Sequence, residues 1–380
     1  MYHYRFVSRI EDIPATQWNR LTGTDYPFLR HEFLHALESS GSVGEQRGWQ
    51  PEHLVIEADD ALVAVLPLYR KSHSYGEYVF DWSWADAYHH HGIDYYPKLL
   101  SAIPFTPASG PRLACHDDCD RGLLMATLSQ ALQTRVEQSG ASGWHLLFPD
   151  LPQLNLLQTL DADLRLGCQF HWFNQGFGSF DDFLASFSSR KRKDVRKERQ
   201  RVVQQGLTLT RLCGEAIDDD AWQLFYHCYQ ATYAKRSGHG GYLTEAFFQQ
   251  LRESMPEQLM MVVAHEGEQP IAAALYFFSS TTLYGRYWGA LAERDGLHFE
   301  ACYYQGIEFC IERGLATFDA GAQGEHKISR GFTPTLTYSL HYLHHPQFRQ
   351  AVQHFLEQES EATRQYQQAA SSSLPFKAGL

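Results

Sequence analysis

The last third of the chain contains six side chains of types that exchange protons or stabilise charge, and these are His298, Glu300, Tyr304, Glu325, His326 and Lys327. A glutamate or histidine can accept a proton from a reacting group, and a lysine or tyrosine can stabilise a developing negative charge. We expect Glu325 or His326 to accept the proton and Lys327 or Tyr304 to stabilise charge. The alternative is structural, because a Glu-His-Lys run after a strand is more often a solvated loop.

The pattern of apolar residues predicts the elements that must position these side chains. It indicates three strands at 260–264, 271–278 and 283–288, followed by a helix at 299–312. A strand at 316–319 and a last strand that ends near 343 follow the helix. Gly314 stands where the C-terminal cap of the helix belongs, and the fifth strand ends in the segment 321–327. This order resembles the acyltransferase half of a GCN5-related N-acetyltransferase (GNAT) fold, in which the helix N-terminus faces the donor.

The length of 380 residues exceeds one typical hydrophobic core and predicts two domains. The first half repeats the element order loosely, without sequence identity. We therefore expect an α+β (α/β) fold of two tandem acyl-CoA N-acyltransferase (GNAT)-like domains, with mixed, mostly antiparallel sheets flanked by helices. The expected boundaries are 1–165 for the first domain, 166–345 for the second, 188–205 for a basic helix within it, and 346–380 for a C-terminal helix and disordered tail.

The composition is that of an ordinary soluble globular protein, with 44% apolar and 20% charged residues. No window approaches the roughly 18 consecutive apolar residues of a membrane span. The N-terminus lacks the apolar segment of a secretory signal. The seven cysteines are odd in number and scattered, which favours free thiols over a disulfide framework. We expect a cytoplasmic protein, and the sequence favours no particular oligomeric state.

One segment is strongly basic although the whole chain carries a formal charge of −12. Residues 190–201 contain eight basic and two acidic residues. The overall charge argues against a protein that binds nucleic acid with its whole surface, but this segment can bind an anion. The candidate anion- or tRNA-binding residues are Arg190, Lys191, Arg192, Lys193, Arg196, Lys197 and Arg199. The alternatives are a nucleotide diphosphate precursor, an anionic membrane surface and a solvated helix face.

Two further groups of residues are candidates for substrate binding. The group in the first half suggests a pocket wall for the acceptor and comprises His73, Tyr75, Glu77, Asp81 and Trp82. The group in the second half comprises Arg286, Tyr287, Trp288, Gln323 and Arg330. Plain sheet packing is the alternative for its alternating aromatic residues. We expect no metal, because the histidines at 89–91 are adjacent and no second ligand group has a known spacing.

Several segments carry a family resemblance. The basic segment with Lys191, Arg192, Val195, Arg196 and Lys197, followed by the Gly-Leu pair at 206–207, resembles the K-x-R-x-x-I-R-K…G-V pattern of Fem-type aminoacyltransferases. The next helix, with aromatic or basic residues at 226, 229, 233 and 236, is similar to the second domain of that superfamily. More narrowly, the chain from about 25 to 345 resembles FemAB-like proteobacterial proteins described as peptidoglycan biosynthesis or N-acetyltransferase proteins. The matching strings lie at 71–82, 95–98, 104–107, 298–300, 303–306, 321–327 and 330–332.

The resemblance implies a reaction as well as a fold. The Fem relationship implies a donor carried on tRNA and an amine acceptor on a cell-wall (peptidoglycan) precursor, with aminolysis of an activated ester or thioester. An acetyl-CoA-dependent N-acetyltransferase is the alternative. Such enzymes bind pyrophosphate with a Q/R-x-x-G-x-G/A loop, whereas residues 290–298 have one glycine and two acids, which disfavours coenzyme A. A third alternative is a non-catalytic binding protein on a degenerate GNAT scaffold. We expect no resident cofactor beyond acyl-CoA or aminoacyl-tRNA as donor substrate.

Overall fold

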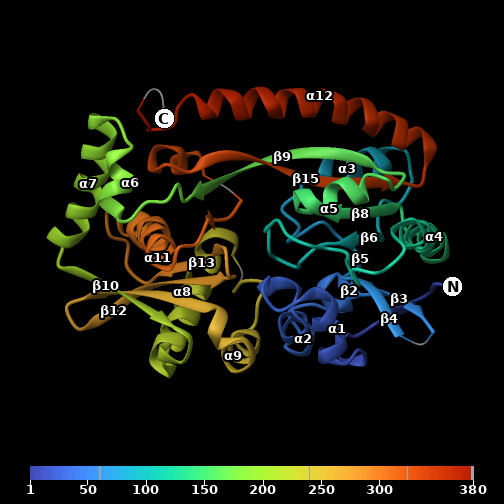
Figure 1. Cartoon of the computed structure of the whole chain (residues 1–380), viewed down its shortest axis with the longest axis horizontal. Coiled ribbons are helices and arrows are strands. Elements are labelled where there is room, and N and C mark those ends of the chain that lie inside the picture. Colours follow the sequence, from blue (N-terminus) through green and yellow to red (C-terminus); the bar gives the residue numbers. More distant parts are fainter. Residues whose placement is uncertain (60, 239, 323, 378–380) are drawn as a thin grey trace. The chain divides into compact units, whose positions relative to one another are not determined.

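The computed structural model divides the chain into two compact units (Figure 1). Unit 1 comprises Met1–Cys168 and Leu336–Gln365. Unit 2 comprises Gln169–Thr335 and the described residues from Tyr366 onward. The structure describes residues 1–59, 61–238, 240–322 and 324–377.

The chain returns to unit 1 near its C-terminus, in a way that the sequence-based boundaries do not include. Those boundaries placed 336–345 in the second domain and 346–365 in a separate segment. In the structure, the end of β15 (Thr333–Leu343) pairs antiparallel with β8 (Gly143–Leu147). Partners so far apart in sequence leave no local pattern, which is why hydrophobic periodicity did not assign this strand to unit 1.

The sheet of unit 2 contains β10, β11, β12, β13, β14 and the end of β9, in that order. Their bounds are Leu207–Cys213, Leu259–Glu266, Gln269–Phe278, Thr282–Ala290, Thr317–Asp319 and Asp163–Phe173. Neighbouring strands are antiparallel except β13 and β14, which are parallel. The predicted meander, helix and fifth strand are therefore confirmed in this order.

Helices flank this sheet. They are α6 (Phe180–Ala185), α7 (Ser189–Gln204), α8 (Asp219–Ser237), α9 (Glu245–Ser254), α10 (Leu297–Phe299) and α11 (Gln305–Arg313). α8 packs on β12 and β13, and α11 packs on β13 and β14. The Asp218 side chain accepts a hydrogen bond from the Ala221 N–H and so caps the start of α8. α11 ends at Gly314 in the left-handed conformation, as predicted.

Two local features of unit 2 differ from the expected elements. The predicted helix at 299–312 contains a π-helical turn, Glu300–Tyr304, between α10 and α11. The run Glu325–Arg330 is a 3-10 helix rather than the end of a strand. Gly321 and Gly324 precede it with φ of 89° and 114°, a conformation that favours glycine, so the chain turns away after β14.

Unit 1 contains two groups of paired strands. β1 (His3–Val7), β3 (His53–Ala58), β4 (Ala61–Leu66) and β7 (Ala114–Cys115) form one sheet. In the other group β15 pairs with β8, followed by β6 (Lys98–Ser101), β5 (Tyr69–Lys71) and β2 (Trp49–Pro51). The helices are α1 (Ala15–Thr22), α2 (His31–Ser39), α3 (Trp82–His90), α4 (Arg121–Ser139) and α5 (Leu151–Leu157). The element order that the first half was expected to repeat loosely includes the hairpin β3–β4, the helix α4 and the strand β8.

The C-terminal segment is more ordered than its composition indicated. α12 spans Pro346–Ser371, and the chain beyond it keeps defined contacts in unit 2. The Phe376 ring packs edge-on against Phe187, and the Lys377 N–H donates to the Ser186 carbonyl. Burial of this aromatic ring holds a segment for which we expected disorder. Within the described part of the chain, no helix has the length and apolar character to cross a bilayer.

Candidate active site in unit 2

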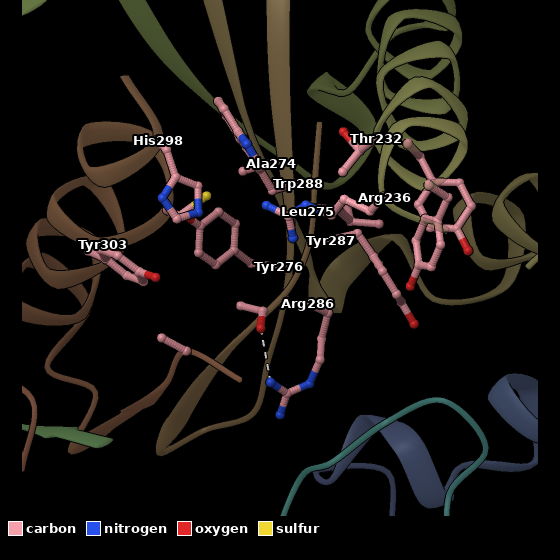
Figure 2. Close-up of a pocket in the computed structure, with 15 residues that line it drawn as sticks. Thr232, Arg236, Ala274, Leu275, Tyr276, Arg286, Tyr287, Trp288, His298 and Tyr303 are labelled. Atoms are coloured by element: carbon pink, nitrogen blue, oxygen red, sulfur yellow. Dashed lines mark hydrogen bonds between the residues drawn. The ribbon is translucent and has the colours of Figure 1, made fainter. Parts of the chain in front are cut away.

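A pocket opens in unit 2 where two neighbouring strands part. β13 and β14 pair in parallel from Thr282 with Thr317 to Tyr284 with Asp319, and β13 continues beyond this pairing to Ala290. The pocket has a volume of about 290 Å³ (Figure 2). Its lining includes residues from the end of β13, the facing part of β12, α8 and the α10–α11 turn.

Arg286 is the extra residue of a β-bulge in β13. Leu275 of β12 pairs with Tyr287, and the next residue, Tyr276, pairs with Gly285, so Arg286 lies between the two pairs. β-Bulges commonly occur beside active sites, where they redirect side chains. All five residues line the pocket.

The bulge also changes which side of the sheet the end of β13 faces. Leu283 and Gly289 would share a face in a regular strand, because they are six positions apart and side chains alternate between the two faces. Here a Cβ on Gly306 of α11 would lie 3.2 Å from Leu283, whereas a Cβ on Gly289 would lie 2.0 Å from the Cys228 carbonyl oxygen of α8. The strand end therefore packs on α8 and helps to shape the pocket.

The two walls of the pocket come from helices. α8 contributes Tyr229, Thr232, Tyr233 and Arg236. The turn between α10 and α11 contributes His298, Cys302 and Tyr303. Figure 2 shows Arg236 reaching into the pocket from α8, with His298 and Tyr303 on the opposite side. Of these residues only His298 was among the predicted site residues, although positions 229, 233 and 236 had been noted for their resemblance to the Fem superfamily. The spacing 229, 232, 233 and 236 places four residues on one helix face and was the signal that could have found the α8 wall.

The wall opposite α8 carries neutral groups that can handle a proton. Burial lowers the pKa of His298 to about 4, so this imidazole is neutral at pH 7. The Tyr303 hydroxyl lies 2.8 Å from Nε2 of His326. Burial raises the pKa of Tyr303 and lowers the pKa of His326, so both are neutral as well. Burial also raises the pKa of Cys302, which is therefore a thiol.

A buried ion pair lies behind the pocket. Nη2 of Arg286 lies 2.7 Å from Oδ2 of Asp319, and both side chains are almost fully buried. Burial acts to raise the pKa of Asp319, but Arg286 outweighs it and the pKa falls to about 2. Lys327 Nζ donates to the Gly321 carbonyl at 2.7 Å, and burial lowers its pKa to about 8. Arg286 thus lines the pocket with its charge balanced, and Lys327 is buried beside it.

The structure places four of the other predicted residues of unit 2 away from the pocket lining. Glu300 forms a bidentate pair with Arg199 of α7, and Tyr304 donates to Glu198 on the same helix at 2.6 Å. Arg330 also pairs with Glu198 and stacks over a phenylalanine ring. Glu325 is exposed and accepts a hydrogen bond from Tyr366. Tyr287 and Trp288 line the pocket, and Gln323 lies outside the described residues.

Comparison with known proteins identifies the family. A family model described as peptidoglycan biosynthesis/recognition, FemAB-like, matches residues 9–378. The chain belongs to the FemAB-like family. A search of curated proteins finds no significant match.

Three solved structures resemble this FemAB-like chain. A C-terminal domain assigned to a lysylphosphatidylglycerol synthetase of Agrobacterium fabrum matches with 10% identity and a TM-score of 0.53, covering 90% of this chain and 94% of its own. FemX matches with 15% identity and a TM-score of 0.49, over 81% and 92% of the two chains. A tandem GNAT protein from the clavulanic acid pathway matches with 9% identity and a TM-score of 0.46, over 90% and 98%. The expected α+β fold of two units with mixed, mostly antiparallel sheets is confirmed, and family membership links the chain to peptidoglycan.

In unit 1 of the FemAB-like chain, the space that corresponds to the pocket is filled. β6 and β8 form a parallel pair like β13 and β14. The loop that follows β6 is buried from Ala102 to Ala108. Arg112 is fully buried and donates to the carbonyls of Ala108, Gly110 and Leu147. This region of unit 1 is therefore closely packed.

The predicted acceptor group of unit 1 divides into buried and exposed members. Glu77 and Asp81 are buried, and both accept from Lys98 Nζ, which lies 2.7 Å from Glu77. Tyr75 and Trp82 are exposed, with ring centroids 5.0 Å apart. His73 Nε2 bonds the carbonyl of Arg47. The described residues contain no group of three or more His, Cys, Asp or Glu arranged to hold a metal.

The basic residues of α7 fall into two sets. Arg199 pairs with Glu300 and Glu308, and Arg196 pairs with Asp181. In the part of the chain that the structure describes, five candidates make no ion pair: Arg190, Lys191, Arg192, Lys193 and Lys197. Val195 and Val202 are buried beneath the helix, whereas Arg190, Lys193 and Lys197 are exposed and can contact an anionic ligand.

Proposed function

We propose that the FemAB-like chain transfers an aminoacyl group from an activated ester to an amine of a peptidoglycan precursor. The observation that carries this proposal is the pocket of unit 2, at the divergence of β13 and β14, whose lining includes the neutral side chains of His298 and Tyr303, with His326 in contact with the Tyr303 hydroxyl outside the lining. Aminolysis needs a group that accepts the proton which the attacking amine loses. The lowered pKa values of His298 and His326 keep both imidazoles neutral and able to accept a proton, and the raised pKa of Tyr303 keeps its hydroxyl protonated, so that it can relay one.

The proton moves from the amine through Tyr303 to His326. The amine nitrogen bonds the carbonyl carbon, and the bond from that carbon to the ester oxygen breaks. The Tyr303 oxygen takes the amine proton while its own proton passes to Nε2 of His326, 2.8 Å away. The imidazolium then returns a proton, through Tyr303, to the leaving alkoxide. His298 is a weaker acceptor because its pKa is lower, at about 4.

The acyl group passes directly from donor to acceptor. A covalent acyl-enzyme would need a thiolate at Cys302, the cysteine that lines the pocket. Burial raises the pKa of Cys302 and keeps it protonated. Direct attack within a complex of enzyme, donor and acceptor is therefore the mechanism that this pocket favours.

The donor is an aminoacyl-tRNA. The five unpaired basic residues of α7 supply contacts for phosphates, and a tRNA offers many. The segment at 290–298 carries Glu293 and Asp295, which pair with Lys235 and Arg201 and would repel a pyrophosphate placed beside them. This distribution of charge favours tRNA over coenzyme A.

The test is a transfer assay with purified protein and labelled donors. Aminoacyl-tRNA and acetyl-coenzyme A are each supplied with a peptidoglycan precursor that carries a lysine or diaminopimelate amine, and labelled product is separated from donor. Product from aminoacyl-tRNA alone supports the proposal. Product from acetyl-coenzyme A alone would replace it with N-acetyltransfer, and binding of the precursor without product from either donor would favour a recognition protein.

A further inference from the structure

The pocket of unit 2 contains a positive charge that its lining does not balance. Two of the lining side chains are arginines, Arg236 and Arg286, and none is an aspartate or glutamate. Arg286 is balanced by Asp319 behind the pocket. Arg236 has no carboxylate within ion-pair distance among residues 1–59, 61–238, 240–322 and 324–377. The charge at Arg236 is therefore free for a ligand.

The acids near the adjoining opening are already paired with other cations. Arg236 also lines a second, larger hollow of about 770 Å³, which shares Thr232, Trp288 and His298 with the pocket. The acids of this hollow, Glu293 and Asp295, form ion pairs with Lys235 and Arg201. Arg236 thus stands where the two spaces meet, with no protein anion assigned to it.

We propose that Arg236 binds the carboxylate of an amino-acid-type acceptor, whose reacting amine stands on the carbon next to that carboxylate. The proposal rests on the proposed aminolysis for the role of the amine. The carboxyl group of an aminoacyl donor is esterified to its carrier, so it offers no anion at its reacting end, and the carboxylate comes from the acceptor. A guanidinium holds a carboxylate with two parallel hydrogen bonds, which fixes the orientation of the neighbouring amine.

The pocket suits a carboxylate better than a phosphate. A volume of about 290 Å³ lies at the lower end of ligand sites and suits a group of amino-acid size. A pyrophosphate placed in the larger hollow would lie beside Glu293 and Asp295. Its two or more negative charges would compete with those acids for Lys235 and Arg201. The aromatic walls, with Tyr229 and Trp288 among them, suit the carbon chain and the amine of the acceptor.

The test measures binding without turnover, so its outcome is independent of the donor. Isothermal titration compares L-lysine, which has a carboxylate beside its α-amine, with cadaverine, which has the same chain and no carboxylate. The proteins are the wild type, Arg236→Gln and Arg236→Lys, with Arg211→Gln as a control that removes an arginine outside the pocket lining. We expect Arg236→Gln to weaken lysine binding about 10- to 100-fold, as the loss of a charge-assisted hydrogen bond requires. Arg236→Lys should lie between, and cadaverine should bind weakly to all.

Three results would overturn the proposal. They are equal binding of lysine and cadaverine to the wild type, unchanged lysine affinity in Arg236→Gln, and the absence of any lysine binding. Sodium pyrophosphate is the third probe, and its Arg236-dependent binding in place of lysine would assign the residue to a phosphate donor instead. If the transfer assay fails but lysine binding still depends on Arg236, the assignment of aminoacyl-tRNA as the donor is wrong, and the carboxylate site at Arg236 remains supported.

Discussion

The Tyr303 hydroxyl lies 2.8 Å from Nε2 of His326, and it connects a residue that lines the pocket to one that does not. The contact joins the π turn before α11 to the 3-10 helix after β14. Two elements that are remote in sequence thus provide a proton path from the pocket to a partly exposed imidazole. A π turn within an α-helix often marks a functional site, and here it carries the pocket residues Cys302 and Tyr303.

Loss of the Tyr303–His326 path should slow transfer while substrate binding is kept. We expect Tyr303→Phe and His326→Gln each to lower kcat about 10²- to 10⁴-fold, the usual contribution of a positioned proton acceptor. The double variant should be no slower than the slower single variant, because both residues serve one step. Kinetics with saturating acceptor measure kcat, and circular dichroism of each variant checks the fold. Full kcat in His326→Gln would contradict the path.

The pH dependence of the reaction should follow the same group. Burial lowers the pKa of His326 below its ordinary value of 6.5, so the imidazole is neutral and able to accept a proton at pH 7. As the pH falls through the lowered pKa, protonation removes the acceptor. We therefore expect kcat to hold through neutral pH and to fall only in acid, with the acidic limb absent in His326→Gln. A limb centred above 6.5 would exclude His326 as the group that titrates.

The element order of unit 2 could be predicted because alternation and helical spacing are local. The positions of its polar side chains could not, because two irregularities change their direction. The bulge at Arg286 shifts the end of β13 by one residue, and the π turn rotates the next residues about the helix axis. Glu300 and Tyr304 therefore meet α7, while His298 and Tyr303 line the pocket. One inserted residue turns the side chains that follow it to the opposite face of the strand or helix. The composition and the hydrophobic periodicity of the sequence hardly change, so the sequence does not reveal the insertion.

The basic side of α7 should control tRNA affinity through charge. We expect the triple variant Lys191→Gln, Lys193→Gln, Lys197→Gln to weaken tRNA binding and to reduce the slope of log affinity against log salt by about 3, or about 1 for each lost phosphate contact. A filter-binding titration at several salt concentrations measures the slope. The control removes three arginines from unit 1, at Arg5, Arg9 and Arg349, with the same change in net charge. Equal salt slopes in the two variants would mean that the basic residues of α7 form a solvated helix face and do not contact tRNA.

The contact between Gly289 and α8 should be required for the shape of the pocket. A Cβ at this position would lie 2.0 Å from the Cys228 carbonyl oxygen, so α8 must move away from β13 in Gly289→Ala. We expect a loss of stability of about 1–3 kcal/mol from overpacking, together with weaker ligand binding, because α8 carries Tyr229 and Arg236. Urea unfolding and titration with L-lysine measure the two effects. Gly122→Ala in α4 is the control, because the added Cβ would lie 3.4 Å from its nearest neighbour, Oδ1 of Asp120, which is an ordinary contact distance.

Lys98 should be the most sensitive charged residue of unit 1. Its ammonium lies 2.7 Å from Glu77 Oε2, contacts Asp81 as well and is fully buried, while Glu77 Oε1 and Asp81 Oδ1 have no hydrogen-bond partner among the residues that the structure describes. Lys98→Met would leave two buried carboxylates without this cation, so we expect a loss of about 3–5 kcal/mol in the free energy of unfolding. Arg5→Gln, which breaks a more exposed pair with Glu57, should cost about 0.2–1 kcal/mol. Urea denaturation followed by circular dichroism compares the two. Similar losses would mean that Lys71, 3.7 Å from Glu77, takes over the charge of Lys98.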